Sequence, residues 1–434
     1  MRNGASRTAL LAGVAFGVLA AGIGEATAGG FAVREQSTYG QGASFAGIAA
    51  GGALSGMFWN PAVMTQFGGI NAETGVAGIF PNSKHTPEPT STLFVFGGAG
   101  NSSDSAAVPS VYASWQVRPD VWLGLSVNSP FGLSVTFPNI WAGRNYAGNT
   151  DLKTYNATPS LALRINNWLS VGAGVQIMYG KAELNNGLPI VPGAFAKITG
   201  NGWAYGFTAG VTVTPGPSTQ IGLGWRSAMD LDIDGTLELS APLPSSAGPV
   251  STKLRLPDIV SLGLRHKLSQ QFTVMGTVEW SNWSRIGTSA VNSAGGPALI
   301  LGAPITLPFE YSDGWFFSIG GEYAYSDTLT LRAGVGYEIS PITDRVRTPR
   351  LPDNDRVWTS VGLSYKPMAN LSVDLAYTHI FVDDTPVNVG PGNPWFNPGL
   401  PIIYNGSASS HVDILSLGVR YRFNPPPPAL VTKG

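Results

Sequence analysis

Apolar residues recur at every second position in short runs along most of this chain. In residues 171–179, the apolar positions Val171, Val175 and Ile177 alternate with Gly172 and Gln176. The same alternation runs through 371–378 and 415–423. A period of two is typical of β-strands that turn one face to an apolar environment. The pattern therefore predicts strands whose second face carries small or polar side chains.

Such runs recur along the whole chain after the first 68 residues. They predict about 14 strands, an even number, as single-chain bacterial barrels have. The expected strands are 69–80, 107–117, 121–137, 151–165, 169–184, 201–213, 219–238, 252–266, 271–285, 311–325, 328–340, 356–366, 370–382 and 411–423. The connections between them alternate between short and long. This two-sided asymmetry indicates an all-β fold, a 14-stranded antiparallel transmembrane β-barrel in the outer membrane, with short periplasmic turns. Both termini are then expected in the periplasm.

The segment before the first strand has another pattern. Residues 29–68 are rich in Gly and Ala and follow neither a period of 2 nor one of 3.6. An apolar segment of this kind needs other surface to pack against. We therefore expect it to be a hatch that plugs the barrel formed by 69–423.

The sequences at the two ends of the chain indicate a cleaved signal peptide and a C-terminal tail. Arg2 and Arg7 precede an apolar stretch, and Ala26-Thr27-Ala28 is a small-residue cleavage site, so 1–28 is interpreted as a signal peptide. Residues 424–434 are rich in proline, which cannot continue a strand ladder, so a short periplasmic tail is expected.

Composition supports this class and excludes others. Charged residues are 12% of the 434 residues, the net charge is −1, and there is no Cys. The balance gives no reason to expect nucleic-acid binding, and a disulfide scaffold is excluded. No apolar run after Ala28 is long enough for a transmembrane helix. Aromatic residues near strand ends are expected in interfacial girdles; they include Trp115, Trp122, Trp280 and Tyr421.

The alternation places several charged residues on the inner face of the wall. A charge facing lipid at mid-bilayer costs about 2–4 kcal/mol, so the candidate lumenal cations are Arg164, Arg226, Arg265 and Arg332. One interpretation is a structural ion network that holds the hatch. The other is that one or two of them bind a substrate carboxylate, which suits the arginine fork.

One expected strand is interrupted by Ser129, Pro130, Phe131 and Gly132. Pro130 cannot donate to a ladder, and Gly132 marks a bulge or kink. An ordinary bulge is one interpretation, and a lateral opening in the wall is the other.

No catalytic constellation is found. The four histidines have no metal-ligand spacing, and the Asp230–Gly235 stretch lacks the Glu that a calcium loop requires, since that position is Ala241. We expect neither an enzyme nor a cofactor nor a metal.

Several motifs in order resemble the FadL-type family of outer-membrane transporters of long-chain fatty acids and hydrocarbons. They include Asn60-Pro61-Ala62 in the hatch, then Pro130–Gly132, 141–144, 225–227 and Pro352–Arg356. The resemblance covers essentially the whole mature chain. It implies a hatch-occluded barrel, passive diffusion of substrate from an external apolar groove to a buried apolar pocket, and sideways exit beside a kinked third strand.

A buried apolar pocket suits such a substrate, since each CH₂ group removed from water contributes about 0.8 kcal/mol. The hatch residues expected near this pocket are Phe31, Val33, Met57, Phe58 and Trp59, although plain packing against the wall explains them equally well. The expected partners are a hydrophobic small molecule and the outer-membrane lipid and lipopolysaccharide, with the protein a monomer.

Three alternatives stay open. Uncharged hydrocarbons or monoaromatics are favoured if the pocket lacks a paired cation. A barrel-embedded lipid enzyme would need an exposed Ser/His pair. A polar porin is disfavoured by the Gly/Ala-rich hatch and the low charge.

Overall fold

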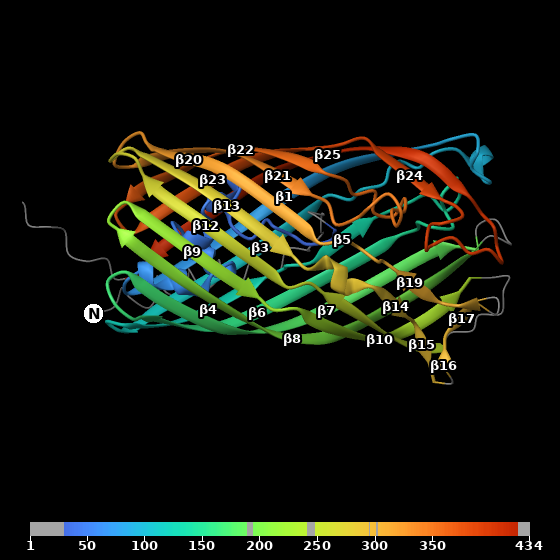
Figure 1. Ribbon diagram of the computed structural model, residues 1–434, viewed down its shortest axis with the longest axis horizontal. Coiled ribbons are helices and arrows are strands. Elements are labelled where there is room, and N and C mark those ends of the chain that lie inside the picture. Colours follow the sequence, from blue (N-terminus) through green and yellow to red (C-terminus); the bar gives the residue numbers. More distant parts are fainter. Residues whose placement is uncertain (1–29, 189–193, 241–247, 295, 301–302, 424–434) are drawn as a thin grey trace, which may run out of the picture.

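The wall of the molecule is a closed sheet. The computed structural model describes residues 30–188, 194–240, 248–294, 296–300 and 303–423. Within these ranges, 14 wall strands close into one antiparallel barrel (Figure 1). The expected fold class is confirmed. The expected signal peptide and the expected C-terminal tail lie outside the described residues.

Each expected strand has a counterpart in the wall. The wall strands are β1 (Ile70–Pro87), β3 (Ala106–Arg118), β4 (Val121–Asn128) continued by β5 (Gly132–Val135), β6 (Thr150–Arg164), β7 (Leu169–Gly187), β8 (Phe195–Gly216), β9 (Thr219–Arg226) continued by β10 (Met229–Leu239), β11 (Gly248–Leu256) continued by β12 (Ile259–Lys267), β13 (Phe272–Ser281), β20 (Gly314–Ala324), β21 (Leu329–Ile339), β22 (Arg356–Met368), β23 (Leu371–Val382) continued by β24 (Thr385–Val389), and β25 (Tyr404–Arg422). The barrel closes where β1 pairs with β25, from Asn71↔Arg422 to Pro87↔Gly406.

Several strands are longer than the alternation predicted. β8 spans 22 residues, whereas 201–213 was expected. The added residues carry polar outward pairs such as Lys197 with Glu183, 2.9 Å apart. Because these residues do not alternate between apolar and polar, the hydrophobic pattern could not predict this part of the strand.

The two faces of the wall differ as expected. On β7 and β8, Val175, Ile177 and Phe207 are exposed on the outer face, whereas Gln176 and Met178 are fully buried on the inner face. Trp122 was expected in the interfacial aromatic girdle, and this prediction is wrong. It is fully buried and donates its Nε1–H to the Phe67 carbonyl at 2.8 Å, so it points into the barrel and not toward lipid.

Long connections gather at one end of the barrel, here called the loop end, on the right in Figure 1. They contain short elements, which are β2 (Gly100–Asn101), η4 (Phe94–Phe96), η5 (Trp283–Ile286), β14 (Thr288–Ala290), β15 (Asn292–Ser293), β16 (Gly296–Pro297), β17 (Leu299–Ile300), β18 (Ala303–Pro304) and β19 (Thr306–Pro308). The opposite end has only short turns.

Residues 30–69, here called the N-terminal segment, lie inside the barrel in blue in Figure 1. The segment contains α2 (Thr38–Gln41), η1 (Ile48–Ala50), η2 (Leu54–Phe58) and η3 (Pro61–Gln66). Ser37 caps α2 by accepting the Gly40 N–H at 2.9 Å. None of the described helices is long and apolar enough to cross a bilayer.

The N-terminal segment approaches the wall most closely at glycines on the inner face, here called the glycine belt. A Cβ built on any of them would meet the segment within about 3 Å. The belt consists of Gly75, Gly172, Gly210, Gly222, Gly224, Gly263, Gly320, Gly334, Gly362 and Gly418. Thr38 lies over the closing seam, against Gly75 of β1 and Gly418 of β25. Segment backbone therefore packs on wall backbone at seven of these glycines, and the side chains of Thr38 and Asn60 fill the space at the other three.

Candidate functional site

The wall is interrupted between β4 and β5. Their shared neighbour β6 pairs Asn156 with Asn128 and Lys153 with Gly132, so the interrupted strand carries one extra residue. On the other side, β3 pairs with β4 only as far as Val111↔Val127. In the part of the chain that the structure describes, β5 forms no ladder with β3. The interruption is therefore a bulge that opens the β3 side of the ladder locally. Pairing on that side resumes at the bridge between Ser103 and Val135, just before β3 begins.

The side chain of Thr154 on β6 satisfies part of the freed backbone. The Phe131 N–H donates to Thr154 Oγ1 at 3.0 Å, and the same hydroxyl donates to the Phe131 carbonyl at 2.6 Å. Ser129 Oγ donates to the Thr154 carbonyl at 2.7 Å. Buried backbone groups need partners, and one hydroxyl on the neighbouring strand takes the place of ladder bonds here.

The N-terminal segment provides hydrogen-bond partners for the other backbone groups that the bulge frees. Ala32 and Phe131 form an isolated antiparallel bridge. The Val33 N–H donates to the Pro130 carbonyl and the Gly132 N–H to the Phe31 carbonyl, both at 2.9 Å. The interrupted wall strand is thus paired inward, with the segment in the barrel.

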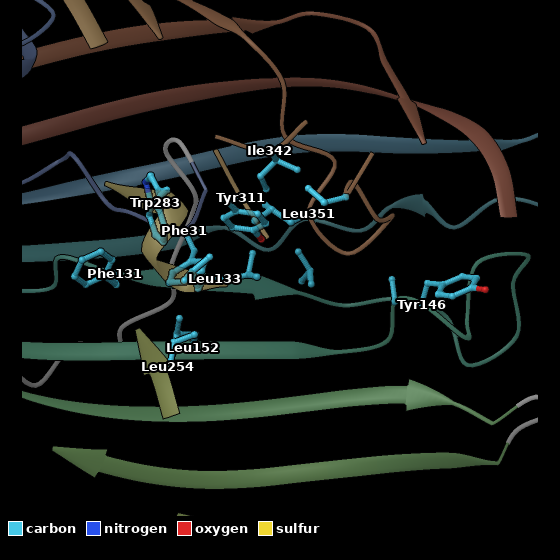
Figure 2. Close-up of a cluster of buried hydrophobic side chains, with 14 of the residues drawn as sticks. Phe31, Phe131, Leu133, Tyr146, Leu152, Leu254, Trp283, Tyr311, Ile342 and Leu351 are labelled. Atoms are coloured by element: carbon cyan, nitrogen blue, oxygen red, sulfur yellow. The ribbon is translucent and has the colours of Figure 1, made fainter. Parts of the chain in front are cut away.

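An apolar cluster lies at this junction, on the loop-end side of the segment. Phe31 packs edge-on against Trp283, with ring centroids 4.7 Å apart, and against Phe131 at 6.3 Å. Figure 2 shows these rings beside Leu133 and Leu152 of the wall and Tyr311 and Leu351 of the connections. The cluster is therefore built from the segment, the interrupted strand and the loop end together.

A groove opens farther toward the loop end. It has a volume of about 450 Å³ and is lined mainly by apolar side chains, among them Tyr146, Leu188, Ile198, Trp395, Phe396 and Ile402. Tyr146 also belongs to the apolar cluster. The loop groove and the apolar cluster are therefore adjacent.

The five hatch residues expected near a pocket do not lie together. Phe31 is in the apolar cluster. Val33, Met57, Phe58 and Trp59 pack in a second cluster, between the segment and the wall. Only Phe31 therefore faces the loop-end side, and the other four pack as wall contacts.

The Asn60-Pro61-Ala62 motif fastens the segment to β8. Asn60 caps η3 by accepting the Ala62 N–H at 3.0 Å. Its Nδ2 group lies 2.8 Å from the Ala49 carbonyl, 2.9 Å from the Val211 carbonyl and 3.3 Å from Thr212 Oγ1. Pro61 occupies the first helical position, where its missing N–H removes no helical bond.

The four candidate cations all engage the segment. Arg164 donates to the Thr65 carbonyl. Arg226 donates to the Phe58 carbonyl at 2.9 Å, and its guanidinium lies 4.1 Å from the Phe58 ring centroid. Arg265 and Arg332 bind Glu322 at 2.5 and 2.7 Å, and Arg332 lies over the Tyr39 ring at 3.8 Å. Two of the four therefore form ion pairs with a wall carboxylate, and Arg164 and Arg226 bind backbone carbonyls of the segment.

A second charged group surrounds the start of the segment, and the hydrophobic pattern did not predict it. The Gly30 N–H donates to Asp353 Oδ2 at 2.9 Å, and Arg34 binds Glu279 at 2.7 Å. Arg356 pairs with Asp353 and lies 3.8 Å from Glu338. The Pro352–Arg356 motif carries two of these residues, which is the signal that could have located the site.

Glu35 lies within this charged group. It is 4% exposed, and its Oε2 has no hydrogen-bond partner among the described residues. Burial raises the pKa of its carboxyl to about 7, while the neighbouring Arg34 and Arg356 oppose that rise and Glu338 adds to it. The segment therefore carries a titratable group that is near its midpoint at neutral pH.

The acidic stretch after β9 forms ion pairs. Asp230 binds Arg285 at 2.7 Å, and Asp232 binds Lys253 at 3.1 Å. Over the described ranges, no group of three or more His, Asp or Glu residues is placed to hold a metal ion.

Comparison with known proteins identifies relatives over almost the whole chain. Residues 18–423 match the family described as outer membrane protein transport protein (OMPP1/FadL/TodX). A long-chain fatty acid transport protein of Salmonella typhi is 26% identical over 407 residues, covering 85% of this chain and 91% of that protein. A 47 kDa outer membrane protein of Pasteurella multocida is 27% identical over 436 residues, covering 93% and 96%.

Solved structures share the fold. A FadL homologue from Pseudomonas aeruginosa superposes with a TM-score of 0.81 at 24% identity, covering 92% of this chain and all of that one. The toluene transporter TodX of P. putida gives a TM-score of 0.66 at 18% identity, covering 86% and 95%.

Proposed function

Because this chain belongs to the outer membrane protein transport family (OMPP1/FadL/TodX), we propose that it carries hydrophobic compounds across the outer membrane, with long-chain fatty acids as the first substrate class. The relatives named as long-chain fatty acid transport proteins support this choice. The loop end faces the outside, and the turns and both termini face the periplasm. Transport is passive and involves no cofactor.

The route follows the apolar surfaces in order. Substrate first occupies the loop groove of about 450 Å³. It then moves past Tyr146 into the apolar cluster around Phe31 and Trp283. Long acyl chains favour such surfaces, at about 0.8 kcal/mol per buried CH₂. The N-terminal segment acts as the hatch that blocks further passage.

One observation carries the proposal. The backbone pairing of Phe31 and Val33 with Gly132 and Pro130 joins the hatch to the place where the wall ladder is open. Movement of the segment would break this pairing and expose the bulge at Ser129–Gly132. Substrate would then leave sideways into the membrane between β3 and β5.

Uncharged hydrocarbons or monoaromatics are the second candidate. The four lumenal arginines expected as substrate cations already have partners. Arg164 and Arg226 donate to carbonyls of the segment, and Arg265 and Arg332 bind Glu322 of the wall. The apolar cluster itself consists of uncharged residues, and the fold is shared with toluene transporters.

We do not propose an enzyme. Ser102 and His85 lie 3.1 Å apart, but both are buried and His85 Nδ1 has no partner among the described residues. A general base of that kind lacks the acid that would orient it. The outer face, with exposed aromatic and aliphatic side chains, is proposed to contact membrane lipid and lipopolysaccharide around a monomer.

The test is uptake by cells of a bacterial strain that lacks its own fatty acid transporter. Expression of this protein should raise the rate of radiolabelled oleate uptake over an empty vector, and native mass spectrometry should detect bound fatty acid. Uptake of toluene without oleate would favour the second candidate. Uptake of small polar solutes alone would contradict both and indicate a porin.

A further inference from the structure

The outer face of the wall carries a polar groove near the loop end, here called the outer groove. It lies on strands β6, β7, β8 and β10, which are neighbours in the barrel (Figure 1), and has a volume of about 710 Å³. Its side chains point away from the lumen, since Lys153 precedes the buried Thr154 and Asp234 follows the buried Ile233. The outer groove is therefore separate from the substrate route inside the barrel.

The strand register arranges the outward side chains in rows. Tyr155 pairs with Tyr179, and Tyr179 pairs with Trp203. Tyr155 and Trp203 are 36% and 53% exposed. One outward position closer to the loop end, Lys153 pairs with Lys181. A row of exposed aromatic side chains marks the membrane–water interface of a barrel, so the two lysines lie at the depth of lipid head groups.

The two lysines are like charges placed directly opposite each other, an arrangement that destabilises a sheet. Lys153 Nζ lies 2.6 Å from Asp151 Oδ2, and the neighbouring Glu183 is bound by Lys197 at 2.9 Å. Among the described residues, no carboxylate lies within ion-pair distance of Lys181, whose side chain is exposed. An anion between Lys153 and Lys181 would remove their repulsion.

The other side of the outer groove presents hydrogen-bonding groups. Asn201 of β8 pairs with Asp234 of β10, and Thr199 pairs with Thr236. The two threonine hydroxyls lie 3.2 Å apart. Carboxylate, amide and hydroxyl groups can donate to and accept from the hydroxyls of a sugar. The outer groove therefore combines two cations on one side with a polar surface on the other.

A second depression on the outer face has a different character. It has a volume of about 750 Å³ and is lined by exposed apolar side chains such as Ile319, Val335 and Val361, with no charged residue in its lining. Such a surface suits an acyl chain and selects no head group. Of these two depressions, only the outer groove offers the chemistry to recognise a charged, polar head group.

We propose that the outer groove binds the phosphorylated sugar head group of an outer-leaflet glycolipid. A phosphate lies between Lys153 and Lys181, sugar hydroxyls bind Asn201 and Asp234, and the acyl chains run along the apolar band below the aromatic row. The inference goes beyond the transport function and rests only on the proposed orientation, in which the loop end faces outside. Each lysine near anionic lipid strengthens binding about fivefold.

The test measures binding of bisphosphorylated lipid A to the purified protein in detergent micelles, by native mass spectrometry. Lys181→Gln is expected to weaken this binding about fivefold. Lipid A from which the phosphates have been removed should bind the wild type more weakly, and Lys181→Gln should change its binding less than about twofold. The matched control is Lys84→Gln, which removes the same charge from an exposed position on β1 outside the outer groove. It should change neither ligand.

Two outcomes with these variants would overturn the proposal. Unchanged binding of bisphosphorylated lipid A to Lys181→Gln would show that this lysine contacts no head group. Equal weakening by Lys181→Gln and Lys84→Gln would show a response to the net charge of the protein and not to a site. Heat-modified mobility in electrophoresis verifies that each variant has a folded barrel.

Two competitors identify the kind of ligand. Phosphatidylglycerol, which has a phosphate but no sugar, should bind more weakly than lipid A, and equal affinity would contradict a glycolipid site. Inorganic phosphate should not displace lipid A at equal concentration, and displacement would assign the outer groove to free phosphate. Oleate uptake by Lys181→Gln should equal that of the wild type, so a failure of this inference leaves the transport function untouched.

Discussion

The side-chain oxygen of Asn60 occupies the space in which Gly210 would carry a Cβ. A Cβ built on Gly210 would lie 2.0 Å from Asn60 Oδ1, well inside contact distance. The Asn60 amide reaches the Val211 carbonyl only because Gly210 carries no Cβ. The motif in the segment and the glycine in the wall thus form one contact, although they are 150 positions apart in the sequence.

The glycine belt leads to a first prediction. A Cβ on Gly224 would lie 1.8 Å from the Trp59 carbonyl oxygen, and backbone cannot yield as a flexible side chain does. Gly224→Ala should therefore displace the N-terminal segment while the barrel still closes. The expected result is increased permeability of the outer membrane to large antibiotics and steady conductance in planar bilayers.

Gly276→Ala is the matched control for this substitution. It is also a wall glycine, but its Cβ would meet nothing closer than the Ser318 carbonyl at 3.6 Å. It should leave permeability unchanged. If both variants left the outer membrane equally impermeable, the segment would not be held by this contact.

A second prediction concerns the pairing of the segment with the interrupted strand. Ala32 and Phe131 are opposite each other between the two flanking hydrogen bonds. In such a non-hydrogen-bonded pair the Cα atoms lie about 4.5 Å apart, a spacing that a disulfide tolerates. Since the chain has no Cys, Ala32→Cys with Phe131→Cys should form one defined cross-link that stops oleate uptake.

The same double variant serves as its own control. Reduction of the cross-link should restore uptake to the level of the two single variants, measured in the same cells. Full uptake by the oxidised, demonstrably cross-linked protein would mean that the segment need not leave the bulge for transport.

A third prediction concerns Thr154. Thr154→Val keeps the shape of the side chain but leaves the Phe131 N–H and carbonyl without their partner. Each unsatisfied buried group costs about 1–3 kcal/mol, so the bulge should lose order. Faster hydrogen exchange at 128–133 is expected, with Thr199→Val as the control, because the Thr199 hydroxyl contacts Thr236 at the exposed surface. Unchanged exchange would show that the wall holds the bulge without this hydroxyl.

A fourth prediction concerns pH. The Glu35 carboxyl has a pKa of about 7 in the docked segment and 4.5 in an ordinary environment. Its neutral form is therefore the one that docking favours. Docking should be most stable below about pH 4.5, weaken as the pH rises to about 7, and change no further above that.

Hydrogen exchange of residues 30–45 across this pH range measures the effect, after correction for the intrinsic rate. Glu35→Gln should remove the dependence, and Glu88→Gln, at an exposed position, should not. A dependence that persists in Glu35→Gln would assign it to another group.

The wall could be predicted because side chains that face lipid are apolar, whereas the alternate side chains that face the lumen are small or polar. Val175 and Gln176 show this contrast directly. Strand ends such as Phe195–Gly200 could not be predicted, since outward residues such as Lys197 and Thr199 are polar and break the apolar alternation. Trp122 was misplaced for a related reason, because an aromatic residue near a strand end fits a girdle and a lumenal hydrogen bond equally well.

The site was predictable only in part. The interruption at Pro130 is visible in the sequence, because proline cannot donate to a ladder. Its inward pairing with Phe31 is not visible, since that contact joins residues about a hundred positions apart. Glu35 carries no local signal. Only the three-dimensional structure shows that, among the described residues, Glu35 Oε2 is buried without a hydrogen-bond partner.

Thr38 lies under the seam at which β1 and β25 meet, the first and last strands of the wall. The Thr38 side chain fits here only because Gly75 and Gly418 carry no Cβ, and contacts this close leave no room to thread a folded segment into a finished cylinder. We therefore expect the segment to be in place before the two edge strands join, as a template around which the sheet is wrapped. Assembly in the membrane thus ends with the sealing of β25 against β1 over a filled interior.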